Sequence, residues 1–226
     1  MYKVWSFGCS HTEGSELGCH NFIDPDSWSG TAQEWNNQLD KIYKTTDLNR
    51  IERELSYSGQ LAKLLGYELR NCGIKGSGAD RALYEIYYKD IDWDNDIVLV
   101  GYTHIYRFII DTERYDGNRN LNWSKDKATE KFSQDMVRYG PSDWFWSASN
   151  AGIYHMIKTH FPKALMIDTV STTNTYKPGL LLDKITFNSK NLSSFSTTPQ
   201  DKYPGGHFKE YTHAKLAEHI YEKLND

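Results

Sequence analysis

A glycine-rich turn between two segments that each have the pattern of a strand is the feature that most constrains the fold of this chain. Residues 67–71 have the composition of a strand, and the turn Gly73-Ile-Lys-Gly76-Ser-Gly78 follows them. Residues 79–89 then show a helical pattern, and residues 97–100 form a continuous apolar run typical of a buried parallel strand. Strand, glycine turn, helix and strand together predict a βαβ unit and therefore a parallel sheet.

The rest of the chain extends this unit. Residues 2–7 form a β-rich run that ends at Gly8, and the pattern predicts a further strand over 164–168 and leaves 180–187 uncertain. Helices are predicted over about 51–65, 150–160 and 208–224. We therefore expect an α/β fold, a three-layer α/β/α sandwich around a mostly parallel, flavodoxin-like sheet of about five strands.

The length and the spacing of these elements predict one domain over residues 1–226. A chain of 226 residues without a long polar linker is at the upper end of what one hydrophobic core organises. Two polar stretches interrupt the pattern, at about 15–50 and 112–149. We interpret the first as a surface insertion with at most one short helix, and the second as an insertion or lid with a role in specificity.

Composition excludes several classes of protein. The net charge of −4, the pI near 6.1 and the scattered Lys and Arg residues do not indicate a nucleic-acid partner. No apolar run approaches the roughly 18 residues that span a bilayer, so we expect no membrane segment. Three unpatterned cysteines argue against a disulfide framework. The first residues lack a signal-peptide pattern, so synthesis in the cytoplasm is expected, with the final destination, a virion for example, left open.

Two residues near opposite ends of the chain are candidates for a nucleophile and its base. Ser10 follows the first predicted strand directly, which puts its hydroxyl on a tight turn at the carboxyl edge of the sheet. His207 lies just before the closing helix, at the same edge if the chain is wound as expected. A serine nucleophile needs such a base to accept its proton.

These residues lie in segments that resemble the SGNH (GDSL-like) hydrolases. The four matching segments, in order, are Gly8-Cys9-Ser10-His11-Thr12, Asn71-Cys-Gly73-Ile-Lys-Gly76, Gly101-Tyr102-Thr103-His104 and Pro204-Gly205-Gly206-His207. The resemblance implies that Ser10 attacks an ester carbonyl with His207 as general base. It also implies an oxyanion hole formed by the backbone N–H groups of Ser10 and Gly76 with help from the Thr103 hydroxyl. The mechanism that the resemblance implies requires no metal and no organic cofactor.

The sequence departs from the family pattern at three positions. Cys9 replaces the usual Asp beside Ser10 and leaves the serine itself intact. Thr103 stands where the family has an oxyanion Asn, and Pro204 stands where it has the acid that orients the histidine. The nearest replacement is Asp201, six residues before His207; alternatively, a backbone carbonyl orients the ring and leaves a Ser-His dyad. His104 and Arg107 are candidates for substrate binding, although Arg107 could equally form an ordinary salt bridge.

The resemblance leaves two functions open. The first is an esterase that removes an O-acyl group, with O-acetylated carbohydrate as the expected substrate class because relatives often deacetylate glycans. The second is a catalytically weak or inactive module of the same fold that binds a glycan or a protein, for example within a phage particle. The sequence indicates neither the acyl group nor the oligomeric state.

Overall fold

The computed structural model describes residues 1–103, 107–108, 119–120, 143–170, 182 and 184–226. Its centre is a parallel sheet of four strands in the order β2-β1-β3-β6, formed by β1 (Lys3–Phe7), β2 (Glu68–Asn71), β3 (Ile97–Gly101) and β6 (Leu165–Ile167). A single parallel bridge joins Met166 to Thr186 beyond β6. The parallel α/β sheet is therefore confirmed, with four strands in place of about five.

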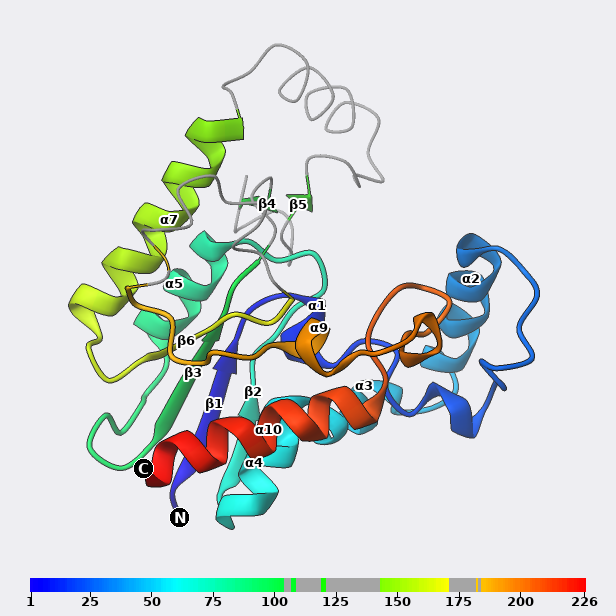
Figure 1. Ribbon diagram of the computed structural model, residues 1–226, viewed down its shortest axis with the longest axis horizontal. Helices are drawn as coiled ribbons and strands as arrows, with labels where there is room; N and C mark the ends of the chain where they lie inside the picture. Colours follow the sequence, from blue (N-terminus) through cyan, green and yellow to red (C-terminus); the bar gives the residue numbers. More distant parts are fainter. Residues whose placement is uncertain (104–106, 109–118, 121–142, 171–181, 183) are drawn as a thin grey trace.

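Helices cover both faces of this sheet (Figure 1). On one side, α5 (Ala79–Tyr88) and α7 (Asp143–His160) pack over a core that includes Phe7 and Val100. On the other side, α4 (Tyr57–Leu65) and α10 (Glu210–Asn225) pack over a core that includes Val4 and Leu99. Residues alternate between the two faces because successive strand side chains point in opposite directions. The three-layer arrangement is confirmed.

The helix expected over residues 51–65 is two helices. α3 (Leu48–Leu55) ends and α4 begins at Ser56, which has an extended backbone and accepts a hydrogen bond from the N–H of Gly59 through its side chain. Serine favours this N-cap role because its hydroxyl satisfies a donor of the first turn. The helical periodicity continues through the break, so the pattern alone predicted one helix.

The insertion at about 15–50 contains more structure than expected. It holds a 3₁₀ turn, η1 (Cys19–Asn21), and a helix of 12 residues, α2 (Ala32–Tyr43). A capping box formed by Thr31 and Glu34 starts α2. Trp35 is fully buried in a third small core, which fixes α2 against the rest of the molecule.

The remaining elements complete the described structure. They are α1 (Ser10–Glu13), α9 (Leu192–Phe195), the 3₁₀ turn η3 (Pro199–Asp201) and an antiparallel pair, β4 (Arg107–Phe108) with β5 (Arg119–Asn120). The insertion predicted at about 112–149 lies largely outside the described residues, and α7 begins at Asp143, earlier than the expected residue 150. Within the described residues, no helix combines the length and the apolar character needed to cross a membrane.

Candidate active site

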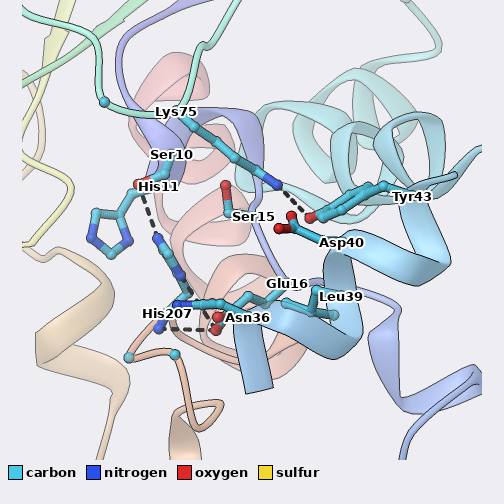
Figure 2. A pocket seen from close by; sticks show the side chains of 13 residues that line it. Ser10, His11, Ser15, Glu16, Asn36, Leu39, Asp40, Tyr43, Lys75 and His207 are labelled. Atoms are coloured by element: carbon cyan, nitrogen blue, oxygen red, sulfur yellow. Dashed lines mark hydrogen bonds and ion pairs between the residues drawn. The ribbon is translucent and has the colours of Figure 1, made fainter. Parts of the chain in front are cut away.

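Ser10 and His207 meet at the carboxyl edge of the sheet. β1 ends at Phe7, and the chain turns through Gly8 at φ 152°, where a side chain would overlap Thr12. Ser10 then opens α1. The Nε2 atom of His207 lies 2.9 Å from the Oγ atom of Ser10, as Figure 2 shows. The expected pairing of these two residues is therefore present in the structure.

A carboxylate that the sequence analysis missed lies behind the imidazole. The Oε2 atom of Glu16 is 3.3 Å from Nδ1 of His207 and also accepts the backbone N–H of His207 at 3.3 Å. The contact with Nδ1 has the distance of an ion pair but not the alignment of a hydrogen bond. Trp35 donates its indole N–H to the other oxygen of Glu16 at 3.2 Å. Glu16 is thus a buried carboxylate that holds both the ring and the backbone of His207.

The backbone of Glu16 is unusual. Its φ is 73°, and it is the one residue other than glycine with positive φ among those described. Such a conformation is unfavourable for a side chain with a Cβ atom and persists only where surrounding contacts hold it. Glu52 supplies one such contact, because its Oε1 atom accepts the backbone N–H of Glu16 at 2.6 Å.

Asp201, expected beside His207, has a different role. Its carboxylate accepts the backbone N–H groups of Thr197 at 2.6 Å and Thr198 at 2.8 Å. These hydrogen bonds lower the pKa of Asp201, since they stabilise the charged form. The expectation is corrected: Asp201 caps the short turn η3, and Glu16 is the carboxylate next to His207.

The double glycine before His207 has a steric explanation. A Cβ atom at residue 205 would overlap the Oε1 atom of Glu16, and Gly206 has a φ of 96°. Gly205 therefore lets the loop pass directly over the carboxylate. Neither residue could carry a side chain without moving Glu16 or straining the loop.

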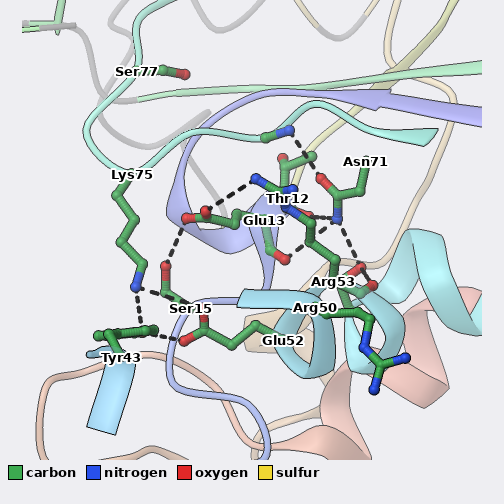
Figure 3. A network of polar contacts seen from close by, with 12 residues as sticks. Thr12, Glu13, Ser15, Tyr43, Arg50, Glu52, Arg53, Asn71, Lys75 and Ser77 are labelled. Carbon is green, nitrogen blue, oxygen red and sulfur yellow. Dashed lines mark hydrogen bonds and ion pairs between the residues drawn. The ribbon is translucent and has the colours of Figure 1, made fainter. Parts of the chain in front are cut away.

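A network of polar contacts that includes buried carboxylates adjoins Glu16, and Figure 3 shows its side chains. Glu52 is fully buried; its carboxylate accepts the hydroxyl of Tyr43 and lies 3.6 Å from the ammonium of Lys75. Burial raises the pKa of Glu52, and the charge of Lys75 opposes that shift. Glu13 is also buried, which raises its pKa, and it lies 3.8 Å from Arg53.

Ser10 and Gly76, the two residues expected to provide backbone donors to an oxyanion, line the same pocket. Ser10 is the first residue of α1, so its N–H has no acceptor within the helix. Gly76 lines the same pocket with φ 78°. The loop that contains Gly76 is hydrogen-bonded to the turn before Ser10. The carbonyl of Gly8 accepts hydrogen bonds from the hydroxyl of Ser77 at 2.7 Å and the N–H of Ile74 at 3.0 Å.

Thr103 does not join them in the pocket. It is 1% exposed, its N–H donates to the hydroxyl of Tyr154 at 2.7 Å, and its own hydroxyl accepts from Tyr154 at 3.1 Å. The expectation that this hydroxyl contributes to an oxyanion hole is corrected for this reason. His104 lies outside the described residues, and Arg107 is described only through its backbone in β4.

The pocket around Ser10 has a volume of about 380 Å³, and its lining combines polar side chains with apolar surface. One wall consists of α2, which sequence analysis did not connect to the site although the Thr31 to Glu34 spacing signals a helix start. The described residues contain no group of three or more His, Cys, Asp or Glu side chains placed to hold a metal ion. The lining residues are Ser10, His11, Ser15, Glu16, Asn36, Leu39, Asp40, Tyr43, Lys75, Gly76, Gly205, Gly206 and His207.

Comparisons with known proteins give a likeness of structure only. No model of a protein family matches the sequence, and no curated protein does. A lipolytic protein of the G-D-S-L family from Desulfitobacterium hafniense superimposes with a TM-score of 0.50 at 10% identity, over 99% of this chain and 100% of its own. An acetyl xylan esterase from Geobacillus stearothermophilus gives 0.51 at 12%, over 99% and 94%.

A third solved structure is a carbohydrate esterase whose active site displays divergent catalytic and non-catalytic binding functions. It superimposes with a TM-score of 0.51 at 14% identity, over 99% of this chain. The chain spans 64% of that protein's length. At these identities the likeness shows a common fold and nothing finer.

Proposed function

We propose, from the SGNH hydrolase fold of this chain, that the protein is a serine esterase with Ser10 as nucleophile, His207 as general base and Glu16 as the acid that orients His207. One observation carries the proposal. The Ser10 hydroxyl lies 2.9 Å from Nε2 of His207, and a buried carboxylate lies 3.3 Å from the opposite nitrogen of the same ring. A nucleophile, a base and an orienting group in this order are the requirements of acyl transfer through a serine.

The reaction follows from this geometry. Oγ of Ser10 attacks the ester carbonyl while its proton passes to Nε2 of His207, and the negative charge of Glu16 stabilises the imidazolium that forms. The backbone N–H groups of Ser10 and Gly76 receive the oxyanion. As the tetrahedral intermediate collapses, His207 returns the proton to the leaving alkoxide. Water then attacks the acyl-serine with the same base and releases the carboxylic acid.

The substrate that we propose is a small O-acyl ester of a carbohydrate. Two of the proteins with this fold are a carbohydrate esterase and an acetyl xylan esterase. The pocket supports such a substrate through its chemistry, because polar side chains from α2 and from the Gly76 loop surround the nucleophile.

The test is hydrolysis of p-nitrophenyl acetate by the purified protein and its Ser10→Ala variant, together with labelling by a fluorophosphonate. We expect turnover that depends on Ser10, with the label assigned to Ser10 by fragment mass spectrometry. Ser15 is a matched control in the same pocket, so the Ser15→Ala protein should still be labelled at Ser10. Equal background rates and no label would refute the esterase proposal.

A second candidate function is a glycan-binding module with little or no catalysis. One observation favours it: Thr103 is turned toward Tyr154, so the oxyanion site has two backbone donors and no side chain from this position. Loss of one such donor typically lowers turnover by about 100- to 1,000-fold. Binding of xylohexaose without any Ser10-dependent turnover would identify this function.

A further inference from the structure

We propose that Asn36 and Asp40 on α2 form the subsite that binds the hydroxyl groups of the alcohol half of the substrate, a neutral carbohydrate. This proposal rests on the proposed esterase function and specifies its substrate recognition. Both residues line the pocket that holds Ser10 and His207. Figure 2 shows them on the helix that forms the pocket wall facing these two residues.

Their spacing places them on one face of the helix. Asn36 and Asp40 are four residues apart, so their side chains lie one turn apart with a rise of about 6 Å between them. Leu39 on the same side is 3% exposed and belongs to the small core around Trp35. Trp35 in turn donates to Glu16, which ties the helix to the catalytic histidine. The subsite is thus held at a fixed position relative to Ser10.

The neighbouring polar side chains of the pocket, Tyr43 on α2 and Lys75 beside Gly76, already have partners. Tyr43 donates to Glu52, and Lys75 contacts both Tyr43 and Glu52. Asn36 and Asp40 are exposed, and within the part of the chain that the structure describes neither side chain has a hydrogen bond or an ion pair. An amide and a carboxylate in this state offer donors and acceptors to a ligand without breaking any contact of the protein.

The charges of the pocket favour a neutral ligand over an anionic one. Of the charged side chains that line it, Asp40 and Glu16 are negative, and Lys75 already contacts Tyr43 and Glu52. A uronate or phosphate group beside Asp40 would meet a like charge. A sugar with free hydroxyl groups can instead donate to Asp40 and both donate to and accept from Asn36.

The test compares two substrates of different size. With acetylated xylo-oligosaccharide, the Asn36→Ala and Asp40→Ala variants should each raise KM about 3- to 10-fold, as expected for one lost hydrogen bond to a neutral group. With p-nitrophenyl acetate, whose alcohol half carries no sugar hydroxyls, kcat/KM should stay within about 2-fold. Asn37→Ala, on the adjacent exposed position of α2, is the matched control and should change neither value.

The two proposals fail in different ways. Absence of Ser10-dependent turnover on p-nitrophenyl acetate would refute the esterase, whereas an unchanged KM for the oligosaccharide in both variants would refute the subsite alone. Calorimetric titration of xylohexaose into the Ser10→Ala protein gives a readout without catalysis. The titration is repeated after Asp40→Ala or Asn37→Ala is added to the Ser10→Ala protein. Binding that is weakened by Asp40→Ala but not by Asn37→Ala supports the subsite. Equal binding by the Ser10→Ala protein and both double variants overturns it.

Discussion

Glu16 and His207 are 191 residues apart in the sequence, yet the carboxylate of Glu16 holds the backbone N–H of His207 and lies 3.3 Å from its ring. The carboxylate beside His207 therefore comes from the segment just after Ser10 and not from the loop that carries His207. This arrangement needs no carboxylate at position 204, where the resemblance to the SGNH hydrolases led us to expect an acid and the chain has Pro204. Glu16 thus holds His207 at its backbone and at Nδ1 of its ring, and Nε2 of the ring faces Ser10.

We predict that Glu16→Gln lowers kcat on p-nitrophenyl acetate by about 100- to 10,000-fold, the range of a general-base contribution. An amide N–H facing Nδ1 would favour the tautomer with a proton on Nε2, which cannot accept the proton of Ser10. The measurement is steady-state kinetics, with circular dichroism to verify folding. Asp201→Asn is the matched control, since Asp201 contacts Thr197 and Thr198, and it should retain wild-type kcat. Loss of activity in Asp201→Asn with full activity in Glu16→Gln would contradict this assignment.

Much of the frame could be predicted from the sequence. A continuous apolar run marks β3 because a central parallel strand is buried on both faces, a β-rich run before Gly8 marks β1, and the glycine turn identifies the start of α5. Ser10 could be predicted because it closely follows β1, and His207 because it lies just before α10.

The acid of the site could not be predicted in the same way. Glu16 lies in an irregular segment, and its position depends on a positive φ that the fixed contacts of Glu52, Trp35 and Gly205 impose. Local sequence carries no signal for such tertiary contacts. Asp201 was the more plausible residue by distance along the chain alone. The α2 wall was missed for a different reason, since its capping box is visible in the sequence but its placement against Ser10 is not.

We predict that Gly205→Ala abolishes most activity while the protein stays folded. The new Cβ atom would overlap Oε1 of Glu16, so the carboxylate or the loop must move and the contact with His207 is lost. Turnover of p-nitrophenyl acetate and thermal unfolding together measure this effect. Gly152→Ala is the control: this helical glycine of α7 has open space at the Cβ position, so activity should stay unchanged and stability should rise by about 0.5–1 kcal/mol. Wild-type turnover in Gly205→Ala would be inconsistent with the close approach.

We predict that Glu52 acts as a hydrogen-bond acceptor more than as a charge. Glu52→Leu removes the acceptor for the N–H of Glu16 and the hydroxyl of Tyr43. The free energy of unfolding should therefore fall by about 2–4 kcal/mol. The value of kcat should also fall, because the backbone of Glu16 is no longer held in place. Glu52→Gln keeps one oxygen for these donors and should lose only about 1 kcal/mol. Urea denaturation of both variants measures the difference, and equal losses in the two would show that the charge is the dominant contribution.

The last prediction concerns the dependence of stability on pH. His213 is fully buried, its Nδ1 accepts the N–H of Tyr57 at 3.1 Å, and burial, followed by the nearby charge of His207, lowers its pKa from 6.5 to about 3. In the unfolded chain the imidazole binds a proton below pH 6.5, whereas in the folded protein it stays neutral until about pH 3. The unfolded state therefore binds more protons in this window, and the free energy of unfolding falls as pH decreases through it.

A matched variant isolates this contribution. Asn at position 213 keeps an acceptor for the N–H of Tyr57 but does not titrate, so the wild-type protein should lose about 2 kcal/mol more than His213→Asn between pH 7.5 and pH 5. The difference between the two proteins is needed because the raised pKa values of Glu13 and Glu52 act in the opposite direction: their contribution is present below pH 4.5 and is lost as pH rises. Urea denaturation at a series of pH values gives the comparison. If the free energy of unfolding changed with pH in the same way in both proteins, His213 would bind its proton equally well in the folded and unfolded states. Its buried contact with Tyr57 argues against this.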